Sequence, residues 1–238
     1  GGREEGGDSR GGYGHTHTHT HTYMRTCTYT GWSTVGDGGG AGGRPEAREM
    51  AAAAAVKGTL YVFGGYGATA GDGRVLGDLW MLDPGLGTWS ELACPPEAAP
   101  SPRFGATMVA VDAVLVVFGG CGPRNVLYGD VHIFDTRTQL WSRLASSGAG
   151  PSPRWGCGGA ALGSGERVVI FGGLGGDGYS NEVFALEPQT GAWEVVGTSG
   201  APSPRAHAVV AMWSGGSERV PCLVVHGGYS SSEGVLGD

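Results

Sequence analysis

Arginine and carboxylate side chains recur in this sequence at regular spacings. The tetrapeptide PSPR ends at Arg103, Arg154 and Arg205, at intervals of 51 residues. Pairs of acids stand five residues apart and precede a tryptophan by six residues, with a period of 52 residues. These sets are Asp78, Asp83 and Trp89; Asp130, Asp135 and Trp141; Glu182, Glu187 and Trp193. Paired carboxylates suit general acid–base catalysis, and an arginine beside prolines suits a docking peptide.

The threefold recurrence of both sets nevertheless favours architecture over chemistry. A residue that every unit repeats serves the unit, whereas a residue that differs between units is free to serve a ligand. We therefore expect the acids to be turn and strand-end groups. We expect the PSPR segments to connect structural units, with the arginines bonded to neighbouring carbonyls or acids. The alternative is that these arginines also line a central funnel.

Histidine and cysteine offer little sign of a metal or nucleophilic site. His132, His207 and His226 each fall where a strand is expected, which argues against a histidine-rich metal centre. His132 holds the position of an aromatic residue in the other units, so we expect it to pack. Cys121 and Cys157 have no basic neighbour in the sequence, and none of the five cysteines forms a CxxC motif. We therefore expect no catalytic residue, metal or cofactor, and no disulfide framework.

Double glycines mark the same repeat and divide it into strands. They occur at positions 64–65, 119–120, 172–173 and 227–228. Each closes a β-branched run such as VLVVFGG, and a shorter strand precedes that run, so the two predict a hairpin. After a glycine-rich loop, DVHIFD and WSRL predict a second hairpin. The segment 51–58, AAAAAVKG, has helical composition, but its place in the repeat predicts a strand.

Four short strands in about fifty residues are typical of one blade of a β-propeller. The segments LYVFGG, LWMLDPGLGTW and VHIFDTRTQLW resemble kelch repeats, in which a double glycine closes the second strand and a tryptophan lies in the fourth. The resemblance covers about residues 44–238. It implies an all-β, kelch-type propeller of four-stranded antiparallel blades, commonly six or seven, used mostly to bind proteins.

The expected blades are three complete ones, at about 44–95, 99–146 and 150–197, and a partial one at 201–238. Residues 1–43 are glycine-rich and Thr/His-rich, and form either a low-complexity segment or a degenerate half-blade. Four histidines there would share one face of a strand and predict only weak, adventitious metal binding: His15, His17, His19 and His21. Closure as four blades is one alternative, and membership of a larger ring, with this chain a fragment, is the other.

Composition narrows the choice of partner. The formal net charge is −7 and the isoelectric point is near 5.4, so no general basic field is available for a nucleic acid. No apolar run approaches the length of a membrane span, so we expect no membrane partner. The scattered cysteines fit a reducing compartment, for which we expect the cytoplasm, with the nucleus as the alternative.

The loops after the double glycines differ in length and sequence, and we expect them to form a partner-binding face. In a four-stranded antiparallel blade they emerge at the same end as the connection between blades. The candidate binding residues are aromatic or forked polar side chains: Tyr66, Arg74, Arg124, Asn125, Tyr128, Trp155, Tyr179 and Asn181.

The expected function is that of a non-catalytic scaffold or adaptor module that binds a protein or peptide through this face. The first alternative is an enzyme or metal-dependent specifier on a kelch-type propeller. Such a site needs different residue types that come together at one opening of the propeller. The second is a kelch segment that regulates a larger catalytic protein.

Overall fold

The structure is a computed structural model that describes residues 43–67, 73–95, 97–163, 165–198, 200–213 and 221–238. These residues belong to one compact unit, Val35–Asp238. The histidine tract and the predicted N-terminal half-blade lie outside the described residues. Apart from one short 3-10 turn, η2 (Pro123–Asn125), the described elements are β-strands. None of the described residues forms a helix with the length and hydropathy that a membrane crossing requires.

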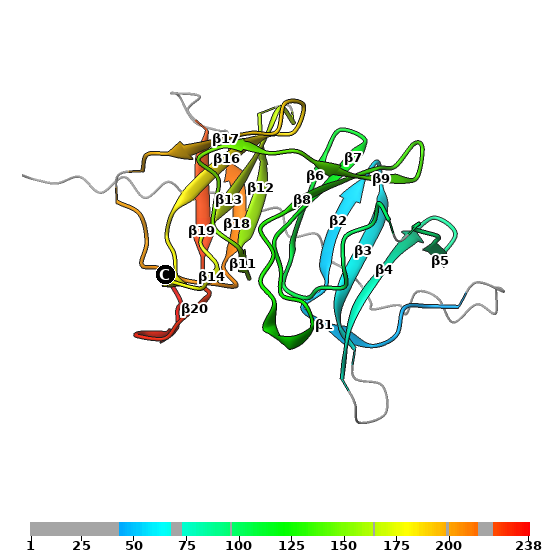
Figure 1. Cartoon of the computed structure of the whole chain (residues 1–238), viewed down its shortest axis with the longest axis horizontal. Coiled ribbons are helices and arrows are strands. Elements are labelled where there is room, and N and C mark those ends of the chain that lie inside the picture. The colour runs from blue at the N-terminus through cyan, green and yellow to red at the C-terminus, as the bar shows by residue number, and fades with distance from the viewer. Residues whose placement is uncertain (1–42, 68–72, 96, 164, 199, 214–220) are drawn as a thin grey trace, which may run out of the picture. The chain divides into compact units, whose positions relative to one another are not determined.

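Three units each form a four-stranded antiparallel sheet in which the strands lie in sequence order (Figure 1). The first blade contains β2 (Ala52–Val56), β3 (Thr59–Gly67), β4 (Arg74–Asp83) and β5 (Thr88–Leu92). The second contains β6 (Thr107–Val111), β7 (Val114–Phe118), β8 (Val131–Asp135) and β9 (Leu140–Leu144). The third contains β12 (Gly158–Leu162), β13 (Arg167–Phe171), β16 (Val183–Glu187) and β17 (Ala192–Val196). The predicted all-β propeller of two-hairpin blades is confirmed.

A fourth unit contributes one hairpin, and short strands decorate the ends of the blades. The hairpin pairs β18 (Val209–Trp213) with β19 (Cys222–His226). The short strands are β1 (Arg48–Glu49), which pairs with β3, and β10 (Ser147–Gly148), which pairs with β17. A three-stranded piece joins β11 (Arg154–Trp155), β14 (Leu174–Gly175) and β15 (Gly178–Tyr179), and β20 (Tyr229–Ser230) pairs with β21 (Gly234–Val235).

The alanine-rich segment is a strand, as its place in the repeat predicts. β2 pairs with β3 along its whole length, from Ala52 opposite Phe63 to Val56 opposite Thr59. Ala52 and Val56 are buried against the second blade. Hydrogen bonding to β3 and packing between blades therefore override the helical propensity of alanine.

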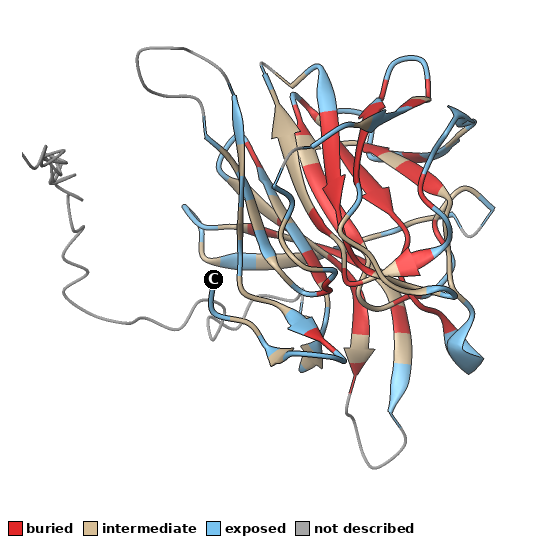
Figure 2. Cartoon of the chain, turned by 90° about the vertical axis from the view of Figure 1, so that its left-hand side faces the viewer, coloured by how far each residue is buried: buried red, intermediate tan, exposed pale blue. Residues whose placement is uncertain are grey.

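Apolar side chains pack between neighbouring blades, and Figure 2 colours much of the central strands as buried. Trp141 of β9 packs on Phe63 of the first blade with 5.4 Å between ring centroids. Trp193 of β17 packs on Phe118 of the second blade at 5.5 Å. Both tryptophans are buried, so the repeated tryptophan of the second and third blades packs between blades. Trp89, in the first blade, is half-buried.

The β18–β19 hairpin is covered on one face. Val210 and Val225 pack against the third blade. On the other face Val209 is 69% exposed and Trp213 is 54% exposed.

A buried arginine stands at the entrance to each blade and makes the same bonds every time. The Arg103 guanidinium donates to the Gly119 carbonyl at 2.9 Å and to Asp130 Oδ1 at 2.6 Å. Its Nε donates to the Ser101 carbonyl at 2.9 Å. The corresponding sets are Arg48 with Gly64 and Asp78, Arg154 with Gly172 and Glu182, and Arg205 with Gly227 and Asp238. We call each set an arginine clamp; it confirms the structural interpretation of the repeated arginines.

The clamp residue also binds the preceding blade through its backbone. The Arg103 carbonyl accepts the Gly65 N–H at 2.9 Å, and the Arg103 N–H donates to the Leu76 carbonyl at 2.9 Å. The same carbonyl leaves no room for a side chain at Gly64, where an added Cβ would lie 2.4 Å from it. The first glycine of each of the first three doublets is therefore required by the approach of the next blade's arginine.

A further polar group joins the clamp from the third strand. His132 Nε2 lies 2.9 Å from Asp130 Oδ2 and its ring is buried. In the first blade Trp80 Nε1 donates to Asp78 Oδ2 at 2.6 Å. His132 is therefore a packing residue, as predicted, and it also hydrogen-bonds to the clamp carboxylate.

The second acid of each repeated pair is a turn group, as predicted. Asp83 Oδ1 accepts the Gly85 N–H at 2.8 Å, and Asp135 Oδ1 accepts the Arg137 N–H at 2.8 Å. Glu187 accepts the hydroxyl of Thr190. These carboxylates fix the turns between the third and fourth strands.

Removing one clamp carboxylate should destabilise the fold in a pH-dependent way. Burial alone would raise the pKa of Asp130, but hydrogen bonds from His132 and Arg103 outweigh it and hold that pKa far below its usual value. Such a carboxylate stabilises the fold above the unfolded-state pKa of about 4. That contribution disappears as the pH falls through the lower folded-state pKa.

We expect Asp130→Asn to lower the free energy of unfolding by about 3 kcal/mol at pH 7, because it leaves the Arg103 guanidinium buried without its counter-charge. The difference from the unmodified protein should shrink below about pH 4. Urea denaturation between pH 2 and pH 7 measures both effects. Asp135→Asn is the matched control, because that carboxylate pairs with Arg137 at the surface. An equal loss in both variants would contradict the clamp.

The space at the double glycine gives a second prediction. Gly119 has φ +68°, and an added Cβ would lie 2.5 Å from the Arg154 carbonyl oxygen. Gly119→Ala should cost about 2–4 kcal/mol through backbone strain and the clash. Gly58→Ala should cost about 1 kcal/mol, because φ is +85° there but nothing lies within 4 Å of the added Cβ. Thermal denaturation distinguishes them, and equal melting temperatures would show that no clash occurs.

Candidate functional site

The first strands of the blades begin at one end, which we call the mouth. One residue from each of the four units adopts a left-handed backbone there: Met50, Gly105, Gly156 and His207, with φ between 53° and 67°. Backbone hydrogen bonds link these residues from unit to unit. The Gly105 N–H donates to the Met50 carbonyl at 2.8 Å, the Gly156 N–H to the Gly105 carbonyl at 2.8 Å, and the His207 N–H to the Gly156 carbonyl at 2.7 Å. These residues line a hollow of 190 Å³ together with Ala51, Ala106, Cys157 and Ala208.

Four ring side chains cross the mouth from blade to blade, and we call them the aromatic row: Tyr66, Phe104, Trp155 and His207. Successive ring centroids lie 6.0, 5.4 and 5.0 Å apart, in edge-to-face arrangements. Tyr66, Phe104 and Trp155 are half-buried, and His207 is exposed. Part of the row is therefore open to solvent.

Two rings of the aromatic row pack directly on the left-handed glycines Gly105 and Gly156. An added Cβ at Gly105 would lie 2.7 Å from Trp155 Cε3, and one at Gly156 would lie 2.9 Å from His207 Cε1. Two of the rings therefore rest directly on the neighbouring blade's backbone. Partial burial lowers the pKa of His207 below its usual value, so the imidazole is neutral at pH 7.

The structure places the predicted binding residues in several different settings. Tyr66 and Trp155 belong to the aromatic row. Arg124 and Asn125 are exposed on η2, both with positive φ. Tyr179 faces Tyr229 with 6.0 Å between ring centroids.

Three other predicted residues already have internal partners. Arg74 forms an ion pair with Glu46 at 2.8 Å. The Tyr128 ring lies under the Arg103 guanidinium, 4.0 Å from its centroid to Cζ. Asn181 Nδ2 donates to the Pro202 carbonyl at 3.0 Å, which secures a connection between blades.

Sequence reasoning missed Phe104, His207, Glu49 and Met50 as residues of the mouth. They occupy the two positions after the clamp arginine, where the four units read Glu-Met, Phe-Gly, Trp-Gly and Ala-His. Variation between units at these two positions is the signal in the sequence that marks them. The expectation that His207 lies in a strand is wrong, because β18 begins at Val209 and His207 precedes it in a left-handed conformation.

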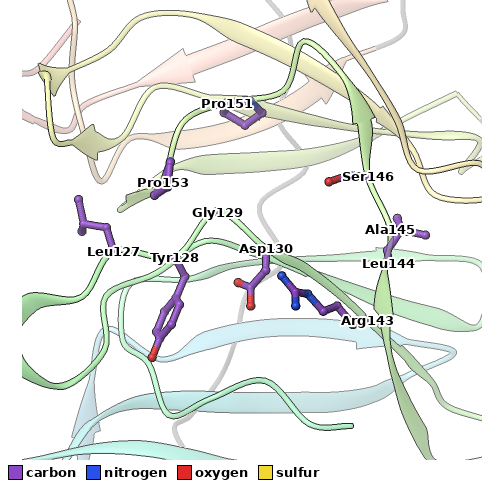
Figure 3. Close-up of a pocket in the computed structure, with 10 residues that line it drawn as sticks. All are labelled: Leu127, Tyr128, Gly129, Asp130, Arg143, Leu144, Ala145, Ser146, Pro151 and Pro153. Atoms are coloured by element: carbon purple, nitrogen blue, oxygen red, sulfur yellow. The ribbon is translucent and has the colours of Figure 1, made fainter.

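A polar hollow of 660 Å³ lies beside the clamp of the second blade (Figure 3). Tyr128, Asp130, Arg143 and the connection at Pro151 and Pro153 line it, and the Arg143 side chain points toward Asp130. Both Asp130 oxygens already accept hydrogen bonds from Arg103 or His132. That carboxylate is thus committed to the clamp and is not placed to act as a base.

Two cysteines near the mouth are held as thiols. Burial raises the pKa of Cys121, and burial raises the pKa of Cys157 to about 12 despite the nearby Arg154. A protonated thiol is a poor nucleophile and a poor metal ligand at neutral pH. Within the described ranges no group of three or more His, Cys, Asp or Glu side chains is arranged to hold a metal ion. The chemistry offered at the mouth is aromatic contact and charge.

Comparison with known proteins gives the family. The family described as the KLHDC2/KLHL20/DRC7 Kelch-repeats domain matches residues 6–165 and 99–238. Acyl-CoA-binding domain-containing protein 4 of Arabidopsis thaliana is 34% identical over 173 residues, which are 72% of this chain and 25% of that protein. The Rab9 effector protein with kelch motifs of Gallus gallus is 35% identical over 133 residues, 53% of this chain and 33% of that protein.

A third relative, tip elongation aberrant protein 1 of Schizosaccharomyces pombe, is 29% identical over 153 residues, 61% of this chain and 13% of that protein. The chain spans a third or less of the length of these relatives. A kelch propeller fits the role of a protein-interaction scaffold. The family match covers most of the sequence and agrees with the double glycines, the tryptophans and the four-stranded blades, so the chain belongs to the kelch-repeat family of β-propeller proteins.

Proposed function

We propose that this propeller is a non-catalytic scaffold that binds a protein or peptide at its mouth, as one module of a longer polypeptide. The observation that carries the proposal is the aromatic row. It brings ring side chains from four units to one partly open surface, although no two of them are close in sequence.

The row has the properties of an interaction surface. Aromatic side chains with few rotatable bonds supply large contact areas at low entropic cost, and they dominate many interfaces. The backbone beneath them is fixed by hydrogen bonds from blade to blade, so little ordering would be needed on binding.

The pattern of repetition supports the same conclusion. The clamp arginine is identical in all four units. The next position is Glu, Phe, Trp or Ala, and the position after that is Met, Gly, Gly or His. The repeated residue builds the blade, and the varied residues are available for recognition.

Substitution of the row should remove binding without unfolding the protein. We expect a random peptide library displayed on phage to yield peptides that bind the unmodified protein. Their affinity for a Phe104→Leu, Trp155→Leu double variant should fall by about thirtyfold or more, the effect of losing interface anchors. Titration calorimetry measures the affinities, and thermal denaturation shows that the variant is folded.

Leu140→Ser provides the matched control. Leu140 is 59% exposed and lies at the β8–β9 turn, at the opposite end of the second blade. This variant should bind the selected peptides as the unmodified protein does. The proposal would be contradicted if no selected peptide depended on the row, or if Leu140→Ser reduced binding as strongly.

A further inference from the structure

We infer that the mouth takes the cationic side chain, an arginine or lysine, of a basic partner segment. This inference rests on the proposed function and adds the chemistry of the partner. It depends on three features of the described residues: the aromatic row, the carboxylates beside it, and the state of the cations around it.

One exposed carboxylate lies at the Tyr66 end of the row, and a second lies in a turn of the third blade. Glu49 lies opposite Tyr66 in the β1–β3 pair, and it is exposed. Asp177 lies in the turn between β14 and β15, and β14 pairs with the strand that carries Trp155. Neither carboxylate forms an ion pair with another of the described residues.

The cations near the row are mostly neutralised. The clamp guanidinium groups of Arg103 and Arg154 are buried and bonded to Asp130 and Glu182. Arg74 is paired with Glu46, and the lowered pKa leaves His207 uncharged at pH 7. These cations therefore do not offset the exposed carboxylate of Glu49 at the Tyr66 end of the row.

Arg124 is a cation near the row that is not neutralised in this way. It is exposed on η2 and forms no ion pair within the described part of the chain. η2 extends from the loop in which Cys121 bridges to Phe104, so Arg124 stands at the rim next to the row. It provides an internal control, since an acidic partner would need it and a basic partner would not.

The row itself complements a cation. The faces of aromatic rings carry negative electrostatic potential and attract guanidinium or ammonium groups within about 6 Å of the ring centre. Met50 is 43% exposed at the same mouth, and its polarisable thioether suits the methylene stem of an arginine or lysine. A carboxylate next to such rings would orient the charged end of the side chain.

The test uses the peptides selected from the displayed library. We expect them to share an arginine or lysine at one position. In a synthetic copy of the tightest peptide, that residue is replaced by citrulline if it is arginine, or by norleucine if it is lysine. Both replacements remove the charge; citrulline keeps the length of arginine, and norleucine keeps the four-carbon stem of lysine. The unmodified protein should bind the neutral copy about fivefold to tenfold more weakly.

Variants of the protein then assign the loss to the mouth. Glu49→Gln should weaken binding of the charged peptide about threefold and bring the two peptides closer in affinity. Glu49 is exposed, so this variant should fold normally. Trp155→Leu should also reduce the difference between the peptides. Arg124→Ala should leave the affinity unchanged or raise it.

The outcomes separate the two proposals. Peptides that depend on Trp155 but share no cation would overturn this inference and leave the proposed function standing. Selection of acidic peptides whose affinity falls with Arg124→Ala would also overturn this inference and leave the proposed function standing. If no selected peptide depended on the aromatic row, both proposals would fall.

Discussion

A buried guanidinium that bonds to a carboxylate and to a glycine carbonyl is the interaction on which this fold depends. Burying such a charge is costly unless it is paired and hydrogen-bonded. In each unit the clamp supplies both conditions, with Arg103 only 1% exposed and bonded to Asp130, Gly119 and Ser101. Because its backbone also binds the preceding blade, the arginine joins two blades at once. Loss of the clamp would therefore destabilise the start of the first strand and also the alignment of that blade with the preceding one.

The same geometry explains why the mouth is free to vary. The clamp fixes the path of the chain into the first strand, and the next two residues follow at the rim. Their backbone is held by hydrogen bonds from blade to blade, and these bonds do not depend on which side chain is present. Glutamate, phenylalanine, tryptophan and alanine all stand at one of these positions. The residue that builds the blade and the residues to which we assign recognition in the proposed function are therefore adjacent in the sequence.

In the fourth unit the arginine clamp forms without a complete four-stranded sheet among the described residues. Arg205 is 1% exposed and bonds to Gly227 and Asp238, although among the described residues its blade consists of the β18–β19 hairpin and the short β20–β21 pair. The clamp carboxylates differ in exposure: the Asp238 side chain is 62% exposed, that of Glu182 is 54% exposed and that of Asp130 is 18% exposed. The alternating exposure of β18 and β19 shows one face packed and one face open. Packing between blades thus follows from apolar side chains, while the clamp sets where each blade begins.

The sequence by itself determined the blades. Their glycines, acids, arginines and tryptophans recur at fixed spacings, and each type has one physical reason to stand where it does. That periodicity also outweighed the helical propensity of the alanine segment, correctly. It named Tyr66 and Trp155 as candidates but could not show that Phe104 and His207 lie beside them, because contacts between blades link residues about fifty positions apart. It also could not show that Tyr128 and Asn181 are occupied by internal partners. Tertiary structure decided those points, since only the stacking of one blade on the next sets which exposed side chains meet and which are already bonded.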